Sequence, residues 1–299
     1  MKMKKNTNTQ TGIVWMACLM LGAAMAACSS DADEPENNDG RKLRQLTITD
    51  VPMTRATLTD NDKTLGASWI AGDKATYFNI SSYSLNEMNY GPLTAATAAE
   101  TSTFTGMVTC KASDYIALVY PENNPPTTGA DRGRFTISLV GQKGTLSDIA
   151  ERYHYLYGVA QVNMKVDDTA VASISYMKPL LAVCKLTFTD TIGNPIPVTT
   201  LSICYGEVEV GYPKSASFTP TQNPDNLSLT TPAQEYWAKL TLTLDTETSD
   251  GVYVALLPCD NEQFFFSVTG SNGTYTGTAS AKLAAGKYYP VTLKLNKTN

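Results

Sequence analysis

The stretch that decides the fold is LRQLTITDVPMTRA, residues 43–56. Leu46 and Ile48 alternate with threonines, which is the period-2 pattern of a strand that buries one face. Val51 and Met53 resume the apolar alternation with the phase shifted by one residue. A shift of phase within one strand indicates a β-bulge or a bend, and here it falls at the aspartate between the two pairs.

The end of this stretch has the features of an exposed segment. Pro52 cannot donate to a ladder, so we expect a sheet edge or a chain exit there. Arg55 follows among small and polar residues, which suit an exposed site for a trypsin-like, arginine-specific protease that leaves Ala56 as the new N-terminus. We therefore expect strand 43–55 to belong to the fold at first and to be removable by cleavage. An ordinary first strand of a β-sandwich fits the same pattern.

The N-terminus has the pattern of a secretory signal over residues 1–27. Lysines near the start precede an apolar run, residues 13–27, which is too short for a membrane-spanning helix of about 20 residues. The run ends Met-Ala-Ala-Cys at Cys28, which resembles a bacterial lipobox, although methionine stands where leucine is usual. We expect Cys28 to be acylated and to anchor the chain in the outer membrane. A plain signal peptide followed by an incidental cysteine is the alternative.

Residues 28–42 are polar and acidic, so we expect a disordered tether. An acidic run directly after a lipid-bearing cysteine resembles the surface-export signal of lipoproteins in the Bacteroidetes. The formal net charge of the whole chain is −5 and becomes more negative once the signal lysines are removed. An acidic chain without a basic stripe argues against nucleic acid as a partner.

Outside the signal and lipobox, the cysteines are Cys110, Cys184, Cys204 and Cys259. A hairpin centred between Cys184 and Cys204 would place these two opposite each other, but their strand phases disagree. We therefore expect free, mostly buried thiols in place of a disulfide framework.

From residue 56 onward, strand patterns separated by turn signals run through the whole chain. Its 299 residues are enough for two domains of typical size. We expect an all-β fold of two β-sandwich domains in tandem, residues 56–170 and 171–299, which meet near residues 165–180. The residues expected in their cores are Phe78, Leu118, Phe135, Ile137, Leu186, Phe188, Val254 and Leu256.

The segment 144–157 is the least strand-like part of the first half and predicts a short helix. Ser147 is the expected N-cap of this helix. The residues expected to face inward from it are Ile149, Tyr153 and Leu156.

Catalytic and metal-binding patterns are not found in the sequence. His154 is the only histidine, and we expect it to be an ordinary, partly exposed side chain because one histidine offers no choice of geometry for a catalytic triad. There is no HExxH sequence, no paired CxxC and no Walker loop. We therefore predict no catalytic site, no metal site, no cofactor and no enzymatic activity. Exposed tyrosine or tryptophan side chains could stack on sugars.

Several short sequences follow one another in the order found in one family of pilins. They are Trp69 with Gly72-Asp73, Tyr115–Pro121, Tyr155–Gly158, Leu256–Pro258 and Ala285–Tyr289. Together with the lipobox and the arginine site, this order resembles the fimbrillins, the FimA-like and Mfa-like pilins of type V pili in Bacteroidetes. The resemblance covers nearly the whole chain. It implies two transthyretin-like β-sandwich domains, export as a lipoprotein, cleavage after Arg55 and polymerisation by strand exchange.

Strand exchange makes physical sense for a strand that carries Leu46, Ile48, Val51 and Met53. Its removal exposes a groove of apolar side chains and unpaired backbone groups, and an incoming strand from another fimbrial subunit restores both. Assembly therefore waits until the protease has opened the groove.

The C-terminus bears on the position of the subunit in a pilus. Residues 290–295 alternate as a strand, and only the polar residues 296–299 follow. Four residues span at most about 14 Å, which is short for a groove-filling strand. We therefore expect the chain to accept a strand and donate none, as a tip or accessory subunit with an adhesive task. Alternatively, strand 290–295 itself swings out and donates.

Two functions from different classes remain on sequence grounds. The first is a structural or adhesive subunit of a cell-surface fimbrium that passes through an outer-membrane lipoprotein stage. The second is an uncleaved surface lipoprotein that keeps its first strand and binds a glycan or protein on a host or bacterial surface.

Overall fold

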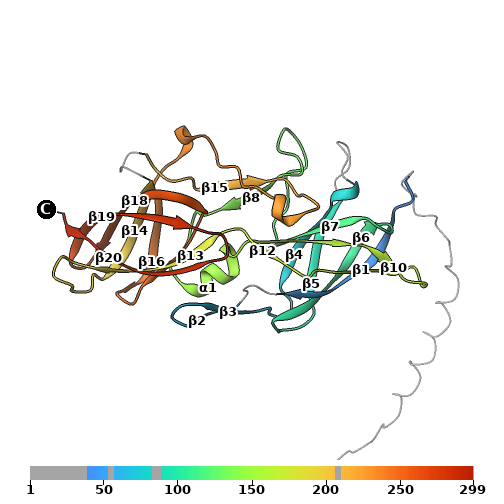
Figure 1. Ribbon diagram of the computed structural model, residues 1–299, viewed down its shortest axis with the longest axis horizontal. Coiled ribbons are helices and arrows are strands. Elements are labelled where there is room, and N and C mark those ends of the chain that lie inside the picture. Colours follow the sequence, from blue (N-terminus) through green and yellow to red (C-terminus); the bar gives the residue numbers. More distant parts are fainter. Residues whose placement is uncertain (1–38, 53–56, 83–88, 206–209, 299) are drawn as a thin grey trace, which may run out of the picture. The chain divides into compact units, whose positions relative to one another are not determined.

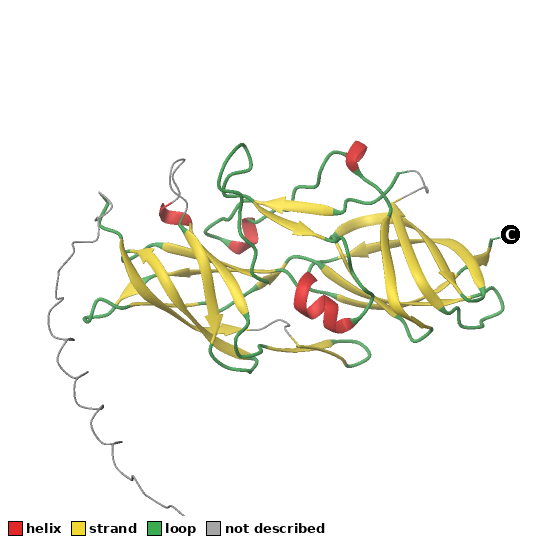
Figure 2. Ribbon diagram, turned by 180° about the vertical axis from the view of Figure 1, so that it is seen from behind, coloured by secondary structure: helices red, strands yellow, loops and turns green. Residues whose placement is uncertain are grey.

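The computed structural model of the chain describes residues 39–52, 57–82, 89–205 and 210–298. Strands make up most of this part of the chain, and helices are confined to short segments (Figure 1, Figure 2). The prediction of an all-β fold is confirmed. Within the described ranges, no helix is long and apolar enough to cross a membrane.

The largest sheet is built from nine strands: β1 (Lys42–Pro52), β4 (Lys74–Asn79), β5 (Tyr90–Ala95), β6 (Thr101–Cys110), β7 (Tyr115–Tyr120), β9 (Leu156–Gln161), β10 (Asn163–Met164), β11 (Ala170–Ser173) and β12 (Lys178–Pro179). Their spatial order is β10-β11-β1-β6-β5-β4-β7-β9-β12. Neighbours are antiparallel except for β1 and β11, which run parallel. The first strand of the chain therefore lies inside the sheet and not at its edge.

The later part of the chain contributes a five-stranded and a three-stranded sheet. The five-stranded sheet is formed, in spatial order, by β16 (Leu240–Thr248), β14 (Val198–Tyr205), β18 (Cys259–Gly270), β19 (Gly273–Leu283) and β21 (Asn296–Lys297). The three-stranded sheet is formed by β17 (Val252–Leu256), β13 (Ala182–Thr189) and β20 (Tyr288–Lys294). Two further pairs complete the strands: β2 (Thr57–Asp60) with β3 (Leu65–Ser68), and β8 (Phe135–Ser138) with β15 (Ser215–Phe218).

The helical segments are short: α1 (Leu146–Asp148), a π-helical turn (Ile149–Tyr153), and 3₁₀ turns at Ile80–Ser82, Pro224–Asn226 and Gln234–Tyr236. The expectation that Ser147 caps the predicted helix is wrong. Thr145 is the N-cap, because it takes the extended conformation and its hydroxyl accepts a hydrogen bond from the Asp148 backbone N–H at 3.3 Å. Ile149 and Tyr153 are buried as expected, whereas Leu156 is buried as part of strand β9.

The central strands of the nine-stranded sheet are buried on both faces. In β7, Ile116 and Leu118 face a smaller core that also contains Trp69, while Ala117 and Val119 face a larger core. Two-sided burial explains why β7 reads as a continuous apolar run instead of an alternating one.

All eight residues predicted for the cores are buried. Leu118 belongs to the smaller core, and the other seven belong to the larger core. The larger core takes residues from both sides of residues 165–180, and the division into two domains there remains a prediction. The cysteines at positions 110, 184, 204 and 259 are free, which confirms that expectation.

Candidate functional site

Strand β1 is held on both sides by the nine-stranded sheet (Figure 1, blue). On one side it pairs with β6, where Ile48 lies opposite Phe104. On the other side it pairs with β11, where Ile48 lies opposite Ala172. We call the space between β6 and β11 that this strand fills the β1 groove.

Three side chains of β1 point into the smaller core. Leu46, Ile48 and Val51 are each 0% exposed. These three residues were predicted to be the apolar face of the strand, and the structure brings them together on one core. Met53, the fourth predicted residue, lies outside the described residues.

The predicted irregularity in β1 is present. The register with β6 shifts between Ile48 and Val51, and Asp50 has a φ of 57°, in the left-handed region. The pairing with β11 stops at Thr49, so Pro52 has a ladder neighbour on one side only. This agrees with the expectation that the proline marks an edge or an exit of the strand.

Beyond the bulge, Trp69 fixes the end of β1. Its indole Nε1–H donates a hydrogen bond of 3.0 Å to the Val51 carbonyl oxygen. The indole ring packs edge-on against Phe104 of β6, with ring centroids 4.8 Å apart, and against Tyr120 of β7 at 5.1 Å. The aromatic cluster therefore depends on the position of this strand.

At the opposite end of β1, Arg41 makes a buried ion pair. Its side chain is 8% exposed, and that of its partner Asp114 is 2% exposed. Nε donates to Asp114 Oδ2 and Nη2 donates to Asp114 Oδ1, each at 2.7 Å, so the pair is bidentate. The guanidinium also donates to the Ser81 carbonyl oxygen at 2.9 Å and pairs with the half-exposed Asp39.

Asp114 has further donors that do not come from β1. Asn79 donates through Nδ2 at 2.9 Å, and the backbone N–H of Lys111 donates at 3.1 Å, both to Oδ2. Burial by itself raises the pKa of Asp114, but the hydrogen bonds from Arg41, Asn79 and Lys111 outweigh it and lower the pKa below its usual value. The carboxylate is therefore charged at neutral pH and held in place by groups of the surrounding body.

Arg41 was assigned to the tether, residues 28–42, and was therefore missed. The structure shows it buried, with β1 beginning at Lys42. The partners Arg41 and Asp114 are 73 residues apart, so no local pattern connects them. The one available signal was a charged residue, Asp114, directly before the apolar run of β7.

The hairpin of β2 and β3 follows directly after the predicted cleavage site. Asp60, at the end of β2, accepts a hydrogen bond from Lys185 Nζ at 2.9 Å and another from the Tyr253 hydroxyl at 2.7 Å. Burial raises the pKa of Asp60, but the hydrogen bonds from Lys185 and Tyr253 and the positive charge of Lys185 outweigh it and lower the pKa to about 2. These contacts hold the start of the segment that would remain after the predicted cleavage, and none of them involves β1.

The processing and lipidation residues predicted from the sequence, Cys28, Arg55 and Ala56, lie outside the described residues. The described chain stops at Pro52 and resumes at Thr57, so it brackets the arginine closely.

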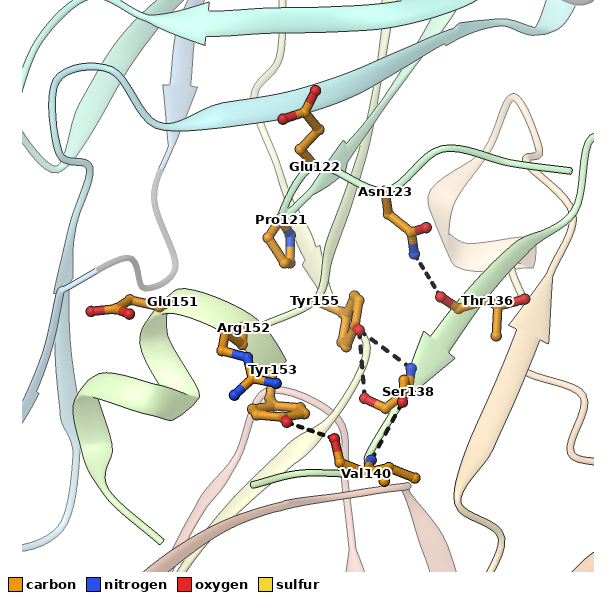
Figure 3. A pocket seen from close by; sticks show the side chains of 10 residues that line it. All are labelled: Pro121, Glu122, Asn123, Thr136, Ser138, Val140, Glu151, Arg152, Tyr153 and Tyr155. Atoms are coloured by element: carbon orange, nitrogen blue, oxygen red, sulfur yellow. Dashed lines mark hydrogen bonds between the residues drawn. The ribbon is translucent and has the colours of Figure 1, made fainter. Parts of the chain in front are cut away.

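A second candidate is a cleft of about 400 Å³ beside the helical segment (Figure 3). Its walls include Arg152, Tyr153 and Tyr155. The Tyr153 hydroxyl donates to the Val140 carbonyl oxygen at 2.7 Å, and the Tyr155 hydroxyl accepts from the Ser138 backbone N–H at 3.3 Å. Both rings are buried, so neither offers a free face for a sugar to stack on. The cleft is accounted for by the packing of these tyrosines.

Three kinds of side chain that often serve in catalysis or metal binding are relevant in the described part of the chain: histidine, cysteine and clustered carboxylates. The expectation that His154 is partly exposed is wrong, because it is only 4% exposed, between the π-helical turn and β9. Burial raises the pKa of the Cys110 thiol to about 11, which keeps it protonated and unreactive. Among the described residues, no group of three or more histidine, cysteine, aspartate or glutamate side chains could hold a metal ion.

No protein-family model matches the chain, and no curated protein matches its sequence. Solved structures do match. A putative cell adhesion protein from Bacteroides ovatus aligns over 85% of this chain and 93% of its own, with 14% identity and a TM-score of 0.54. One from Bacteroides uniformis aligns over 87% and 94%, with 18% identity and a TM-score of 0.50.

The chain shares the fold of these two proteins. A fimbrilin, FimA of Porphyromonas gingivalis, aligns over 85% of this chain and 97% of its own at 9% identity, with a TM-score of 0.38 that is too low to argue from. The two Bacteroides matches agree with the expected fold.

Proposed function

We propose that the chain is a structural and adhesive subunit of a cell-surface type V fimbrium, built from two transthyretin-like sandwiches in tandem. It is exported as a lipoprotein acylated at Cys28 and reaches the cell surface through the outer membrane. An arginine-specific protease cuts after Arg55, and the subunit then accepts a strand from another subunit in place of β1.

One observation carries this proposal: β1 is an internal strand that ends at Pro52, three residues before Arg55 in the sequence. It is paired on both sides, and Leu46, Ile48 and Val51 are fully buried. A strand with these properties leaves a long, apolar groove with unpaired backbone groups when it is removed. Such a groove binds a replacement strand through ladder hydrogen bonds and side-chain pockets. The fold shared with cell adhesion proteins of Bacteroides supports the same function.

Mass spectrometry of protein isolated from the cell surface tests the proposal. We expect assembled material to contain a chain that begins at Ala56. Surface material that contains only the chain beginning at acylated Cys28 would reject the processing step. That result would favour the alternative, a surface lipoprotein that keeps β1 and binds a glycan or protein.

Within the fimbrium, the proposed position is the tip or an accessory site. Strand β20 is paired with β13, and the following Asn296–Lys297 pairs with β19 as β21. These C-terminal residues are thus used inside the chain, and β21 is exposed and polar. Immunogold labelling checks this position. Gold at the distal ends of fimbriae is expected, whereas gold along the whole shaft would show that the chain is a repeating subunit.

A further inference from the structure

The ion pair between Arg41 and Asp114 joins a part of the chain that would leave to a part that would stay. Cleavage after Arg55, on which this inference rests, releases Arg41 together with β1. Asp114 stays, and so do the side chain of Asn79 and the backbone N–H of Lys111, which donate to its carboxylate at 2.9 and 3.1 Å. We call these three groups, with the Ser81 carbonyl oxygen, the Asp114 socket.

The Asp114 socket is built for a positive charge. The Asp114 side chain is 2% exposed in the structure, and Asn79 and the Lys111 backbone N–H still hold its carboxylate in place after Arg41 has gone. A buried carboxylate without a cation is strongly unfavourable, because little water reaches it and its neutral partners offset only part of its charge. A replacement strand that fills only the apolar pockets would therefore leave the socket unsatisfied.

We infer that the Asp114 socket selects replacement strands that carry a basic residue at a fixed distance from their apolar residues. The spacing follows from β1, which the replacement strand copies in direction, antiparallel to β6 and parallel to β11. Counted from Arg41, the buried residues Leu46, Ile48 and Val51 stand five, seven and ten positions later. The partner is thus a subunit whose donor strand has a basic residue five positions before its first buried apolar residue.

Arginine fits the Asp114 socket better than lysine. In the structure the guanidinium makes two parallel hydrogen bonds of 2.7 Å to the carboxylate and a third of 2.9 Å to the Ser81 carbonyl oxygen. A planar fork can satisfy these acceptors together, whereas an ammonium group acts as a point charge. Selectivity is expected in the order arginine, lysine, neutral residue.

A competition experiment tests the inference on the intact body. The full-length chain is cut with an arginine-specific protease, the protease is inhibited, and intact mass confirms a chain that begins at Ala56. Two synthetic peptides are then added in equal excess: one copies residues 41–52, RKLRQLTITDVP, and the other carries Arg41→Gln. Native mass spectrometry measures the ratio of the two complexes in one sample. The comparison therefore does not depend on the absolute affinity of either peptide.

We expect the complex with the Arg41 peptide to exceed the complex with the Arg41→Gln peptide about a hundred-fold. This is the size of effect that follows when one partner of a buried charge pair is removed. The matched control peptide carries Lys42→Gln, which removes the same charge one residue away from an exposed side chain, and we expect a ratio within about three-fold of unity. A peptide with Arg41→Lys should fall between the arginine and glutamine forms.

The possible outcomes distinguish the selectivity of the Asp114 socket from strand exchange itself. Entry of both peptides in equal amounts would overturn the selectivity and leave strand exchange standing. The selectivity would also be overturned if the Arg41 peptide were preferred as strongly over the Lys42→Gln peptide as over the Arg41→Gln peptide. The net charge of the peptide would then explain the preference. Entry of neither peptide would refute strand exchange itself, and the selectivity with it. An Asp114→Asn chain that folds should lose the preference for arginine.

Discussion

Ile48→Ala tests whether β1 is an integral part of the fold before processing. Ile48 is 0% exposed and lies between Phe104 of β6 and Ala172 of β11. The substitution removes Cγ1, Cγ2 and Cδ1 from a site whose neighbours are fixed by the two ladders, so the core cannot close around the gap. Large-to-small substitutions at such sites cost about 2–5 kcal/mol, and we expect a loss of about 3 kcal/mol in the free energy of unfolding.

Urea unfolding followed by tryptophan fluorescence measures this loss. Trp69 packs in the same core as Ile48, whereas Trp237 packs against the larger core. In chains that lack residues 1–27, and with them Trp15, and that also carry Trp237→Phe, the fluorescence change therefore reports on the smaller core. The matched control is Ile192→Ala, which removes the same atoms from a side chain that is 83% exposed. Its cost should stay within about 0.5 kcal/mol.

The result that would refute the reasoning is a loss below about 1 kcal/mol for Ile48→Ala, or a loss equal to that of the Ile192→Ala control. Assembled fimbriae provide a second reading of the same variant. Under the proposed processing these subunits lack the substituted strand, so the Ile48→Ala and unsubstituted subunits should unfold at the same urea concentration. A difference between them would show that β1 remains in place.

Three further substitutions have expected outcomes. Asp60→Asn should lower the free energy of unfolding by about 1 kcal/mol at pH 7. Because the folded-state pKa of Asp60 is lowered to about 2, this contribution is complete above the ordinary value of 3.8 and is lost as pH falls towards 2, so the unsubstituted and Asp60→Asn chains should converge in acid-unfolding curves. Gly270→Ala should cost about 3 kcal/mol in urea unfolding, because the added Cβ overlaps the Pro197 carbonyl, and Gly66→Ala, where the contacts are ordinary, is the control. Arg55→Ala should yield exported, lipidated protein that forms no fimbriae in electron micrographs; normal fimbriae would contradict the assigned cleavage site.

The parts of the fold that follow from local pattern could be predicted. The period-2 alternation of Leu46 and Ile48 and its phase shift at Asp50 predicted a strand with a bulge, and both are present. Buried positions such as Phe135 were identified because one apolar face must be covered whatever the neighbouring strand is. What the pattern could not supply was the identity of the neighbour, and the parallel pairing of β1 with β11 was not foreseen.

The features that escaped prediction depend on residues far apart in the chain or on local geometry. Arg41 reads as part of a polar tether, and only the fold shows that its partner is Asp114, 73 residues away. His154 reads as polar, yet the packing around β9 buries it. Ser147 was predicted as the helix N-cap, and Thr145 is the residue found there. Both side chains can cap a helix, and the backbone conformation decides between them.

The structure also bears on how β1 could leave. Burial of Leu46, Ile48 and Val51 stabilises the bound strand by about 2 kcal/mol each, and the Arg41–Asp114 pair adds to this, whereas the conformational entropy that the strand regains on release opposes both. Release into water would remove these contacts and leave the facing backbone groups of β6 and β11 unpaired. Under the proposed cleavage after Arg55, an incoming strand can replace β1 residue by residue without emptying the groove.

We therefore expect exchange to proceed stepwise, with the incoming strand pairing as β1 unpairs. Both ends of β1 are paired on one side only, because the ladder with β11 covers just Leu46–Thr49. We expect exchange to start at Pro52, because this end lies next to the proposed cut. Arg41, at the opposite end, is then the last residue to be displaced. A donor with apolar residues but no basic residue should advance along the groove and stop with the Arg41–Asp114 pair still closed. Donor strands with and without a basic residue are therefore distinguished at the final step. There the buried ion pair decides whether a nearly complete exchange is finished or reversed.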